Sequence, residues 1–499
     1  MKTLHISDSL LDHPLWLAAD LGKTIPHSPH AVSVCLPTWD HVVGYEEKTP
    51  EVRDAMELGY PRFILHPYVE ELFDDCTERF GKFGQRALAF PSKRVAERCR
   101  DFVVARLGVE GTLHALGFKG IHVIVLPEAA IETAQSFWQH TGDIISSRMA
   151  EAYLNNEEAF PEANRMKKAI RTRIAELIGG NVEDVFLFPT GMAALATIHR
   201  ILGKARPNAK SVQLGFPYVD LMKIQEKFGT GYHFFPENDA ADSEAFRDCL
   251  GAETISGVFT DLPGNPLLGC ASIPKLSRFL KALDIPLVVD ETVGTYYNVD
   301  SLPYADIVMT SLTKYFSGVS NVMAGALILN NASPFYDTFR ALLRDDYEDL
   351  LWGEDAIVLA EHSFNFESRM ARINETAELI AGYLRVHPKV KQVFYPKFNN
   401  RANYSAVMRD QGGYGGLMSV VVKDAATNTK PFYDNLRVCK GPSLGTNYTL
   451  ACPYTQLAHF DELDTVEAMG VSPYLIRVSI GLEDFEDLRT RFDEALSEI

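Results

Sequence analysis

The chain has 499 residues, 46% of them hydrophobic and 23% charged, which is the composition of a globular protein with two or three packed units. Its 48 Lys and Arg against 66 Asp and Glu give a formal net charge of −18, which argues against nucleic acids and anionic membranes as partners. The seven cysteines are scattered without a C-x-x-C pair, and the sequence shows neither a signal peptide nor an apolar run that could span a bilayer. We therefore expect a cytoplasmic protein with free thiols.

The first third of the chain, residues 1–165, is the least regular part. Residues 1–62 are rich in Pro, His and isolated apolar residues and predict an irregular arm. Residues 63–165 alternate helix-like stretches with short apolar runs such as "IHVIVLP", which predicts a small extra α/β insert. We find no internal repeat in the chain.

Residues 166–345 show the clearest alternation of strands and helices. "DVFLFPTG" predicts a strand that runs into a turn, and "MAALATIHRILGKA" predicts a helix that begins directly after the glycine. Short apolar runs such as "IPLVVDET" and "ADIVMTSLT" are typical of buried strands in a mainly parallel sheet. The alternation predicts a large α/β domain.

Residues 346–499 predict a smaller C-terminal α+β domain. Residues 356–388 have the pattern of one long helical stretch. The runs "GLMSVVVKDA" and "YLIRVSIGLED" then predict strands of a second sheet.

Lys314, in "SLTKYFSG", is the first candidate for chemistry. Most lysines at strand ends reach water, and that is the plain interpretation. The alternative is a Schiff-base lysine, which needs an amine that can lose its proton in a shielded site. Ser311 and Thr313 could supply hydroxyls to a nearby anion.

Asp290 follows three apolar residues and should emerge at the carboxyl end of a buried strand. Ligands of open α/β sheets bind at that edge. The carboxylate could hold a pyridinium nitrogen protonated, as a PLP electron sink requires, or it could serve as a helix cap or a loop ion pair.

The turn "FPTGM" could bind an anion. Gly191 and Met192 would present backbone N–H groups at the beginning of a helix, although a single turn glycine is a weak signal. The sequence lacks G-x-G-x-x-G and the P-loop pattern, which disfavours nicotinamide and nucleotide cofactors.

Two more polar residues stand in apolar surroundings. Asn265, in "TDLPGNPLLG", could be an ordinary turn residue. Alternatively, its side-chain amide could contact a ring hydroxyl or a substrate carboxylate. Arg477, inside the apolar run "YLIRVSIG", needs a carboxylate, which could be that of an amino-acid substrate or that of a structural ion pair.

Taken together, these segments resemble the Cys/Met-metabolism family of fold-type I PLP-dependent enzymes. "SLTKYFSG", "VVDETVGT", "PTGMAA", "PGNP", "GPSLG" and "RVSIGLED" are similar to motifs of that family, and "GYPRF" is similar to its Y-x-R segment. The N-terminal region and "GFPYVDLMKIQEKFG" resemble the fungal type of cystathionine γ-synthase most closely. The resemblance implies an aspartate aminotransferase-like large domain with a mainly parallel, seven-stranded-type sheet.

The resemblance also implies roles for single residues, with PLP as cofactor and no metal. Lys314 would hold PLP covalently and shuttle protons, and Asp290 would pair with the ring nitrogen. Tyr218 would stack on the ring and take part in catalysis. The phosphate would be held by Gly191, Met192, Ser311 and Thr313, joined by Tyr60 and Arg62 of a neighbouring subunit, while the ring oxygen and the substrate carboxylate would be held by Asn265, Ser443 and Arg477.

Three departures from the family pattern leave alternatives open. Glu291 follows the key aspartate where the family has Asn. Phe216 is a rival to Tyr218 as the stacking aromatic. Arg148 is a rival to Arg62 as the phosphate ligand.

The implied reaction is γ-replacement on an O-acyl-L-homoserine, with O-acetyl-L-homoserine as the expected donor, through a vinylglycine ketimine. With cysteine as nucleophile the product would be cystathionine. The alternatives are capture of the same intermediate by a carbon nucleophile such as an enolate, a γ-lyase, or a subunit without catalysis. The family implies homodimers or homotetramers with active sites at the dimer interface.

Overall fold

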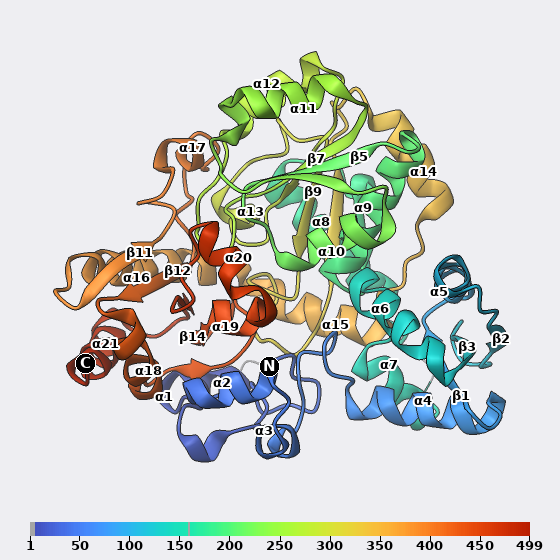
Figure 1. The fold of residues 1–499 in the computed structure, drawn as a ribbon, viewed down its shortest axis with the longest axis horizontal. Coiled ribbons are helices and arrows are strands. Elements are labelled where there is room, and N and C mark those ends of the chain that lie inside the picture. Colours follow the sequence, from blue (N-terminus) through green and yellow to red (C-terminus); the bar gives the residue numbers. More distant parts are fainter. Residues whose placement is uncertain (1–4, 158–159) are drawn as a thin grey trace.

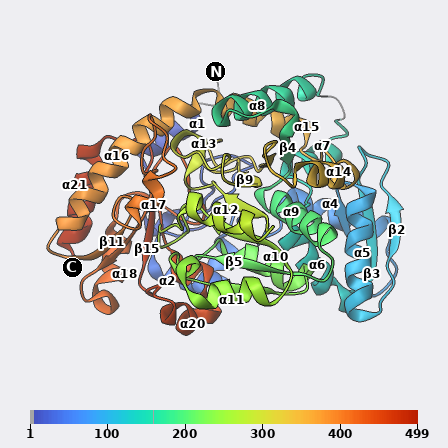
Figure 2. The ribbon, with the colours of Figure 1, turned by 90° about the horizontal axis from the view of Figure 1, so that it is seen from above.

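Three β-sheets, each with its own helices, organise the molecule into three lobes (Figure 1). The computed structural model describes residues 5–157 and 160–499. Each of the three predicted units contains one of the sheets, while their boundaries stay predictions. Seen from above, the C-terminal domain and the insert lie at opposite ends, with the large domain between them (Figure 2).

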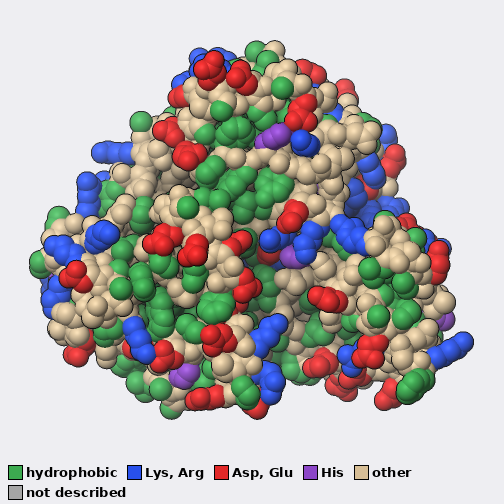
Figure 3. Space-filling model, viewed as in Figure 1, with side chains coloured by type: hydrophobic (Ala, Val, Ile, Leu, Met, Phe, Trp, Pro, Cys, Tyr) green, Lys and Arg blue, Asp and Glu red, His purple; other side chains and the backbone are tan. Residues whose placement is uncertain are grey.

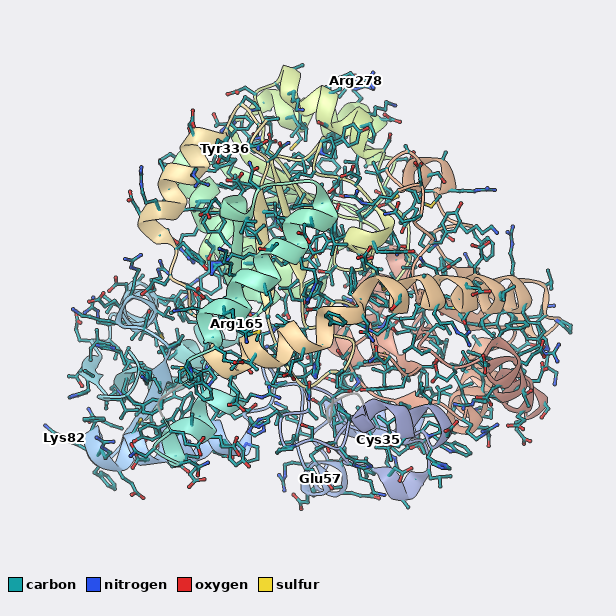
Figure 4. All side chains as sticks on the ribbon, turned by 180° about the vertical axis from the view of Figure 1, so that it is seen from behind. Cys35, Glu57, Lys82, Arg165, Arg278 and Tyr336 are labelled. Carbon is teal, nitrogen blue, oxygen red and sulfur yellow. The ribbon has the colours of Figure 1, made fainter. Side chains whose placement is uncertain are left out.

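The N-terminal arm is less irregular than expected, because it contains short helices. It lies along the C-terminal domain, where the backbone N–H of Leu36 donates to the carbonyl of Lys440 (2.9 Å) and the Tyr433 hydroxyl donates to the carbonyl of Leu36 (2.8 Å). Seen from behind, Cys35 and Glu57 of the arm lie at the bottom of the molecule (Figure 4). The helices are α1 (His5–Asp12), α2 (Trp39–Glu46) and α3 (Pro50–Ala55).

The insert folds as a small α/β unit around its own hydrophobic core. Its antiparallel sheet has the strand order β1-β3-β2, and Lys82 marks its outer end in Figure 4. Its elements are α4 (Pro67–Phe80), β1 (Gln85–Phe90), α5 (Lys93–Leu107), β2 (Thr112–Ala115), β3 (His122–Pro127), α6 (Ile131–Thr141) and α7 (Ser147–Leu154).

The large domain has the predicted mainly parallel sheet of seven strands, in the order β4-β10-β9-β8-β7-β5-β6. Among the strands described there, β10 alone runs in the direction opposite to the other six. The strands are β4 (Val185–Phe188), β5 (Lys210–Leu214), β6 (Tyr232–Phe235), β7 (Ile255–Asp261), β8 (Leu287–Asp290), β9 (Ile307–Ser311) and β10 (Gly325–Leu329).

Helices cover both faces of this sheet, which explains why its strands are apolar throughout. Along β10, Leu327 and Leu329 pack into the core beneath α9, whereas Ala326 and Ile328 pack into the core on the other face. The helices are α8 (Ala163–Ile178), α9 (Gly191–Ala205), α10 (Val219–Phe228), α11 (Glu244–Ala252), α12 (Ile273–Ala282), α13 (Thr295–Asn298) and α14 (Tyr336–Asp346).

The C-terminal domain is a five-stranded sheet in the order β11-β12-β15-β14-β13, packed against helices. The expected single long helix at 356–388 is wrong, because a 3₁₀ turn at Ser363–Asn365 divides it. There the Ser363 hydroxyl donates back to the carbonyl of Leu359 (2.7 Å), a local bond that competes with helix continuation. The elements are α15 (Gly353–His362), α16 (Phe366–Val386), β11 (Val390–Phe394), α17 (Arg401–Ser405), β12 (Leu417–Val422), α18 (Ala425–Asn435), β13 (Cys439–Lys440), β14 (Leu450–Pro453), α19 (Tyr454–Ala458), α20 (Leu463–Ala468), β15 (Ile476–Ser479) and α21 (Phe485–Ser497).

The sheet of the large domain presents polar groups at one edge. Strands β7, β8 and β9 run parallel and end at Asp261, Asp290 and Ser311. Strand β10 is antiparallel to both β4 and β9, so β4 and β9 run in the same direction. Strand β4 therefore also ends at this edge, where α9 begins. Across the described residues, no helix combines the length and the apolar character needed to cross a membrane.

Candidate active site

A cavity of about 900 Å³ lies at this sheet edge, and every predicted site residue lines it. The large domain, the C-terminal domain and the arm all contribute walls. Charged side chains of both signs gather on the face where the three lobes meet (Figure 3). The predicted residues that line the cavity are Tyr60, Arg62, Gly191, Met192, Tyr218, Asn265, Asp290, Ser311, Thr313, Lys314, Ser443 and Arg477.

The Lys314 amine is held by two hydroxyl groups inside the cavity. Its Nζ donates to Ser443 Oγ (2.9 Å) and to the Tyr60 hydroxyl (3.4 Å). Burial lowers the pKa of Lys314, the positive charges of Arg477 and Arg62 lower it further, and Tyr60 opposes them. The amine can therefore lose its proton more readily than a surface lysine, which a reactive amine requires.

A tight loop brings Ser443 to the lysine. Ser443 itself has φ +88°, a left-handed conformation that is costly for a residue with a side chain. Gly445 has φ +76°, and a Cβ there would lie 2.5 Å from the backbone nitrogen of Tyr315. The "GPSLG" segment is thus pressed against the backbone that follows Lys314.

Two carboxyl groups stand side by side at the ends of β7 and β8. Asp290 and Asp261 are paired in the strand register. Burial raises the pKa of Asp290 to about 6, and burial together with the charge of Asp290 raises the pKa of Asp261 well above its usual range. A cationic ring nitrogen would satisfy Asp290, since an opposite charge favours its ionised form.

The beginning of α9 forms a cradle for an anion. The Thr190 hydroxyl caps the helix by accepting from the Ala193 N–H (3.0 Å), whereas the N–H groups of Gly191 and Met192 have no hydrogen-bond partner in the described part of the chain. A Cβ on Gly191 would lie 2.9 Å from Ser311 Cβ, so this close approach needs glycine. A phosphate fits such a helix N-terminus.

Of the two hydroxyls expected beside the phosphate, one is already engaged. The Thr313 hydroxyl accepts from the Ala324 N–H (3.1 Å) and donates to the Ala324 carbonyl (3.3 Å). It therefore fixes the turn that carries the lysine, even though Thr313 also lines the cavity.

Arg62 reaches the cavity through a buried polar cluster. Its Nη2 donates to Asp220 Oδ2 (2.6 Å) and to the Tyr218 hydroxyl (2.5 Å), and its Nη1 donates to the carbonyl of Gln139 (3.0 Å). Burial acts to raise the pKa of Asp220, but the positive charge of Arg62 and the surrounding hydrogen bonds lower it below its usual range. Arg62 is thus a fixed, charged donor in the wall.

Tyr60 and Arg62 lie at the cavity in this single chain, and their expected supply by a neighbouring subunit stays a prediction. Both lie in the cavity of their own chain, and Tyr60 touches Lys314 of that chain. The arm docks on the C-terminal domain and leads the segment to the cavity. The rival Arg148 lies outside the cavity, where it donates to the carbonyl of Asn321 (2.8 Å) and pairs with Asp355 (3.0 Å).

The structure also separates the other two alternatives. Tyr218 lines the cavity, whereas Phe216 is buried in the core with its ring against His459 (5.6 Å between centroids). Glu291 points away from the cavity and accepts from the backbone N–H of Ser301 (2.9 Å). Burial raises the pKa of Glu291 to about 7.

Arg477 has no carboxylate partner among the described residues, so the structural ion pair is not formed there. Its Nη2 donates to the carbonyl of Ser443 (2.6 Å) and its Nη1 to Asn265 Oδ1 (3.3 Å), and it lies over the Tyr454 ring at 4.5 Å. A buried guanidinium with only neutral partners is suited to a carboxylate ligand.

Sequence reasoning missed Asp220 and Asp261. Asp261 follows a strand that is buried along its whole length, which is the same signal that identified Asp290. Asp220, in the first turn of α10, lies only two residues after Tyr218, and no local pattern predicts its contact with the distant Arg62.

Comparisons with known proteins agree with this geometry. The family model of Cys/Met metabolism PLP-dependent enzymes matches residues 129–497. The chain belongs to this family. A second model, the N-terminal domain of fungal trans-sulfuration enzymes, matches residues 68–146, which lie within the insert.

Relatives in the family match almost the whole chain. Cystathionine γ-synthase of Saccharomyces cerevisiae is 32% identical over 96% of this chain and 99% of its own length. The cystathionine γ-synthase-like enzyme iboG2 of Amanita muscaria is 34% identical over 95% of this chain and 96% of its own. The L-2-amino-4-chloropent-4-enoate dechlorinase/desaturase of Streptantibioticus cattleyicolor is 33% identical over 95% and 97%.

Solved structures show the same fold. The structure of cystathionine γ-synthase from Xanthomonas oryzae pv. oryzae with cystathionine has a TM-score of 0.59 at 24% identity, covering 68% of this chain and 88% of that one. As a member of the family, this chain is a PLP-dependent enzyme of the γ-synthase type, and its chemistry is replacement or elimination at the γ carbon. The free N–H groups of α9 and the acid at Asp290 fit the phosphate and the ring nitrogen of PLP.

Proposed function

We propose that the enzyme catalyses γ-replacement on an O-acyl-L-homoserine, with O-acetyl-L-homoserine as donor and cysteine as nucleophile. One observation carries the proposal. The Lys314 amine and the Arg477 guanidinium both bind Ser443, the first at Oγ (2.9 Å) and the second at the carbonyl (2.6 Å). An α-amino acid whose carboxylate pairs with Arg477 therefore has its Cα beside the Lys314 amine.

Each wall of the cavity has a part in the reaction. Bound PLP supplies an electron sink that stabilises negative charge on the substrate carbons. Asp290 would keep the ring nitrogen protonated, and Tyr218 would stack on the ring. Lys314 would remove the Cα proton and later return a proton, and its lowered pKa favours the neutral amine that this role requires.

The phosphate of PLP would be held by groups that either make no other hydrogen bond or can make an additional one. We assign this role to the N–H groups of Gly191 and Met192, to the Ser311 hydroxyl and to Arg62, with Thr313 holding their turn in place. Asn265 and Arg477 bind the ring oxygen and the substrate carboxylate. The remaining volume of the 900 Å³ cavity accommodates the second substrate.

The overall exchange is balanced without any further reactant. The bond between Cγ and the acyl oxygen breaks, and a bond between Cγ and the cysteine sulfur forms. The thiol proton leaves with the carboxylate as acetic acid, and the product is cystathionine.

Mass spectrometry of the products tests the proposal. Purified enzyme with O-acetyl-L-homoserine and cysteine should release cystathionine and acetate in equal amounts, and Lys314→Ala should release neither. Release of a 2-oxo acid and ammonia at the same rate with or without cysteine would identify a γ-lyase. A product only with a β-keto acid would identify a carbon nucleophile. Assembly into homodimers or homotetramers and a cytoplasmic location stay predictions.

A further inference from the structure

A buried arginine of α16, Arg369, lies behind the turn that carries the reactive lysine. The side chain is only 4% exposed, and in the described structure it does not line the cavity. Burial lowers the pKa of Arg369 to about 10. No carboxylate pairs with it in the described part of the chain, and a buried charge without such a partner is costly. The reaction proposed above gives this residue no role.

Every N–H group of the Arg369 guanidinium donates to a neutral oxygen. A guanidinium has five N–H donors in one plane, and here none is left for a ligand. Arg369 therefore holds parts of the chain together and does not bind a substrate. The acceptors are the carbonyls of Tyr315 (3.1 Å), Phe316 (3.0 Å), Ser317 (3.4 Å) and His362 (3.3 Å) and the side-chain oxygens of Asn365 (2.9 Å) and Asn447 (3.0 Å).

Three of these acceptors are the consecutive carbonyls that follow Lys314 in the chain, at residues 315–317. The Gly318 N–H donates to the carbonyl of Lys314 (2.8 Å) and closes the turn. On the other side of the lysine, the Thr313 hydroxyl is bound to the backbone of Ala324. The backbone of Lys314 is thus fixed from both sides, and Arg369 provides the second of these attachments.

The same guanidinium connects the large domain with the C-terminal domain. The lysine turn belongs to the large domain, whereas α16 and Asn447 belong to the C-terminal domain. The Asn447 N–H also donates to the carbonyl of Gly318 (2.7 Å). Asn447 lies four residues after Ser443 in the chain, and Ser443 accepts from the Lys314 amine. Arg369 therefore joins the two loops whose side chains meet in the cavity.

This contact explains the glycine that ends "SLTKYFSG". Gly318 has φ +76°, a conformation that favours glycine. A Cβ at Gly318 would overlap Arg369 Nη1 and Asn447 Oδ1. The turn therefore leaves room for the guanidinium exactly where the two loops come together.

We propose that Arg369 is a positioning residue of the reaction, which sets the distance between the Lys314 amine and the Arg477 guanidinium. Ser443 links these two groups, since its Oγ accepts from Lys314 and its carbonyl accepts from Arg477. A shift of the lysine turn against this loop moves the amine away from the Cα proton of a substrate held by Arg477. The inference rests on the roles of Lys314 and Arg477 in the proposed function, but not on which nucleophile reacts.

The first test measures acetate release from O-acetyl-L-homoserine, because acetate leaves in replacement and in elimination alike. In Arg369→Met, kcat per bound PLP should fall by about 100-fold, since a displacement of about 1 Å costs this much. KM should change by less than about threefold, because the bonds of Arg477 are not altered. Arg369→Lys, which keeps the charge and part of the bonds, should recover part of the loss.

Arg372→Met is the matched control, since Arg372 lies three residues further along α16 and its exposed side chain pairs with Asp484. It should leave kcat and KM unchanged. If Arg369→Met does not fold, Asn447→Ala and Arg369→Lys take its place, each with a loss of about tenfold. A kcat per bound PLP within threefold of the wild type, or a loss that appears only in KM, would show a merely structural arginine and overturn the inference.

A second readout needs no substrate, so it separates this inference from the proposed function. PLP is added to the apoenzyme, and its covalent attachment is followed by absorption. The misplaced amine of Arg369→Met, or of Arg369→Lys and Asn447→Ala if the methionine variant does not fold, should attach PLP more slowly by about tenfold or more, and Arg372→Met should react as the wild type does. If attachment is slow but the wild type releases no acetate, the proposed donor is wrong and Arg369 still positions Lys314. Attachment at the wild-type rate would overturn the inference.

Discussion

Replacing Arg477 by lysine tests whether the guanidinium binds the substrate carboxylate. The substitution keeps the positive charge but removes the planar pair of donors that suits a carboxylate. In the free enzyme this side chain donates to the Ser443 carbonyl and to Asn265 Oδ1, and it is only 6% exposed. A substrate carboxylate would therefore meet a buried guanidinium whose present hydrogen-bond partners are neutral.

The magnitude follows from the lost hydrogen bond. Lysine can replace one of two charge-assisted bonds, so the variant loses one bond of roughly 1.5–3 kcal/mol. Since 1.4 kcal/mol is a factor of ten, KM for the O-acylhomoserine should rise by about 10- to 150-fold. The affinity for PLP should change much less, because the proposal assigns Arg477 to the substrate carboxylate and not to the cofactor.

Steady-state kinetics with varied donor at saturating nucleophile measure this effect, and the absorption spectrum of the bound cofactor checks that PLP remains in place. Arg409→Lys is the matched control. Arg409 donates to the carbonyl of Val299 (3.0 Å) and to Asp300 (3.1 Å) outside the cavity, and its replacement should leave KM within twofold. A KM of the Arg477 variant equal to that of the wild type would refute the assignment.

Two further predictions concern the groups around the amine. Tyr60→Phe removes the hydroxyl that supports the charged amine, so the pKa of Lys314 should fall further. The rate at which the apoenzyme takes up PLP should increase with pH, and the midpoint of this increase should move to lower pH in the variant. A midpoint that stays the same or moves to higher pH contradicts this prediction. Gly445→Ala places a Cβ 2.5 Å from the Tyr315 nitrogen at φ +76°, and in urea titrations it should cost about 2 kcal/mol or more of unfolding free energy. Gly470→Ala has a similar φ of +89° with open space around it, so an equal loss there would show that the close approach is not the cause.

The convergence of the central site residues could be predicted from the sequence. Asp290 and Lys314 follow buried strands, and the carboxyl ends of parallel strands meet at one edge of a sheet. Arg477 was recognisable because a guanidinium in an apolar strand must have a partner. These signals are local, and the physical reason for each lies within a few residues of the chain.

Choices between nearby or equivalent residues could not be predicted in this way. Phe216 and Tyr218 belong to the same turn, and only the packing of Phe216 into the core leaves Tyr218 to line the cavity. The helical pattern continues through 363–365, where a single serine hydroxyl bonds back into the preceding turn.

Long-range contacts were the other limit of the sequence. That Arg62 reaches the cavity of its own chain depends on the docking of the arm and on its distant partners Asp220 and Gln139.

Borohydride reduction of the PLP-loaded enzyme, followed by peptide mapping with mass spectrometry, tests the central claim most directly. The pyridoxyl group should be found on Lys314. Two other lysines are competing attachment sites in this test. Lys223 also lines the cavity, and burial lowers the pKa of Lys440 to about 7, so that its amine is more readily neutral. Attachment to either of these, or an absence of any adduct, would contradict the account.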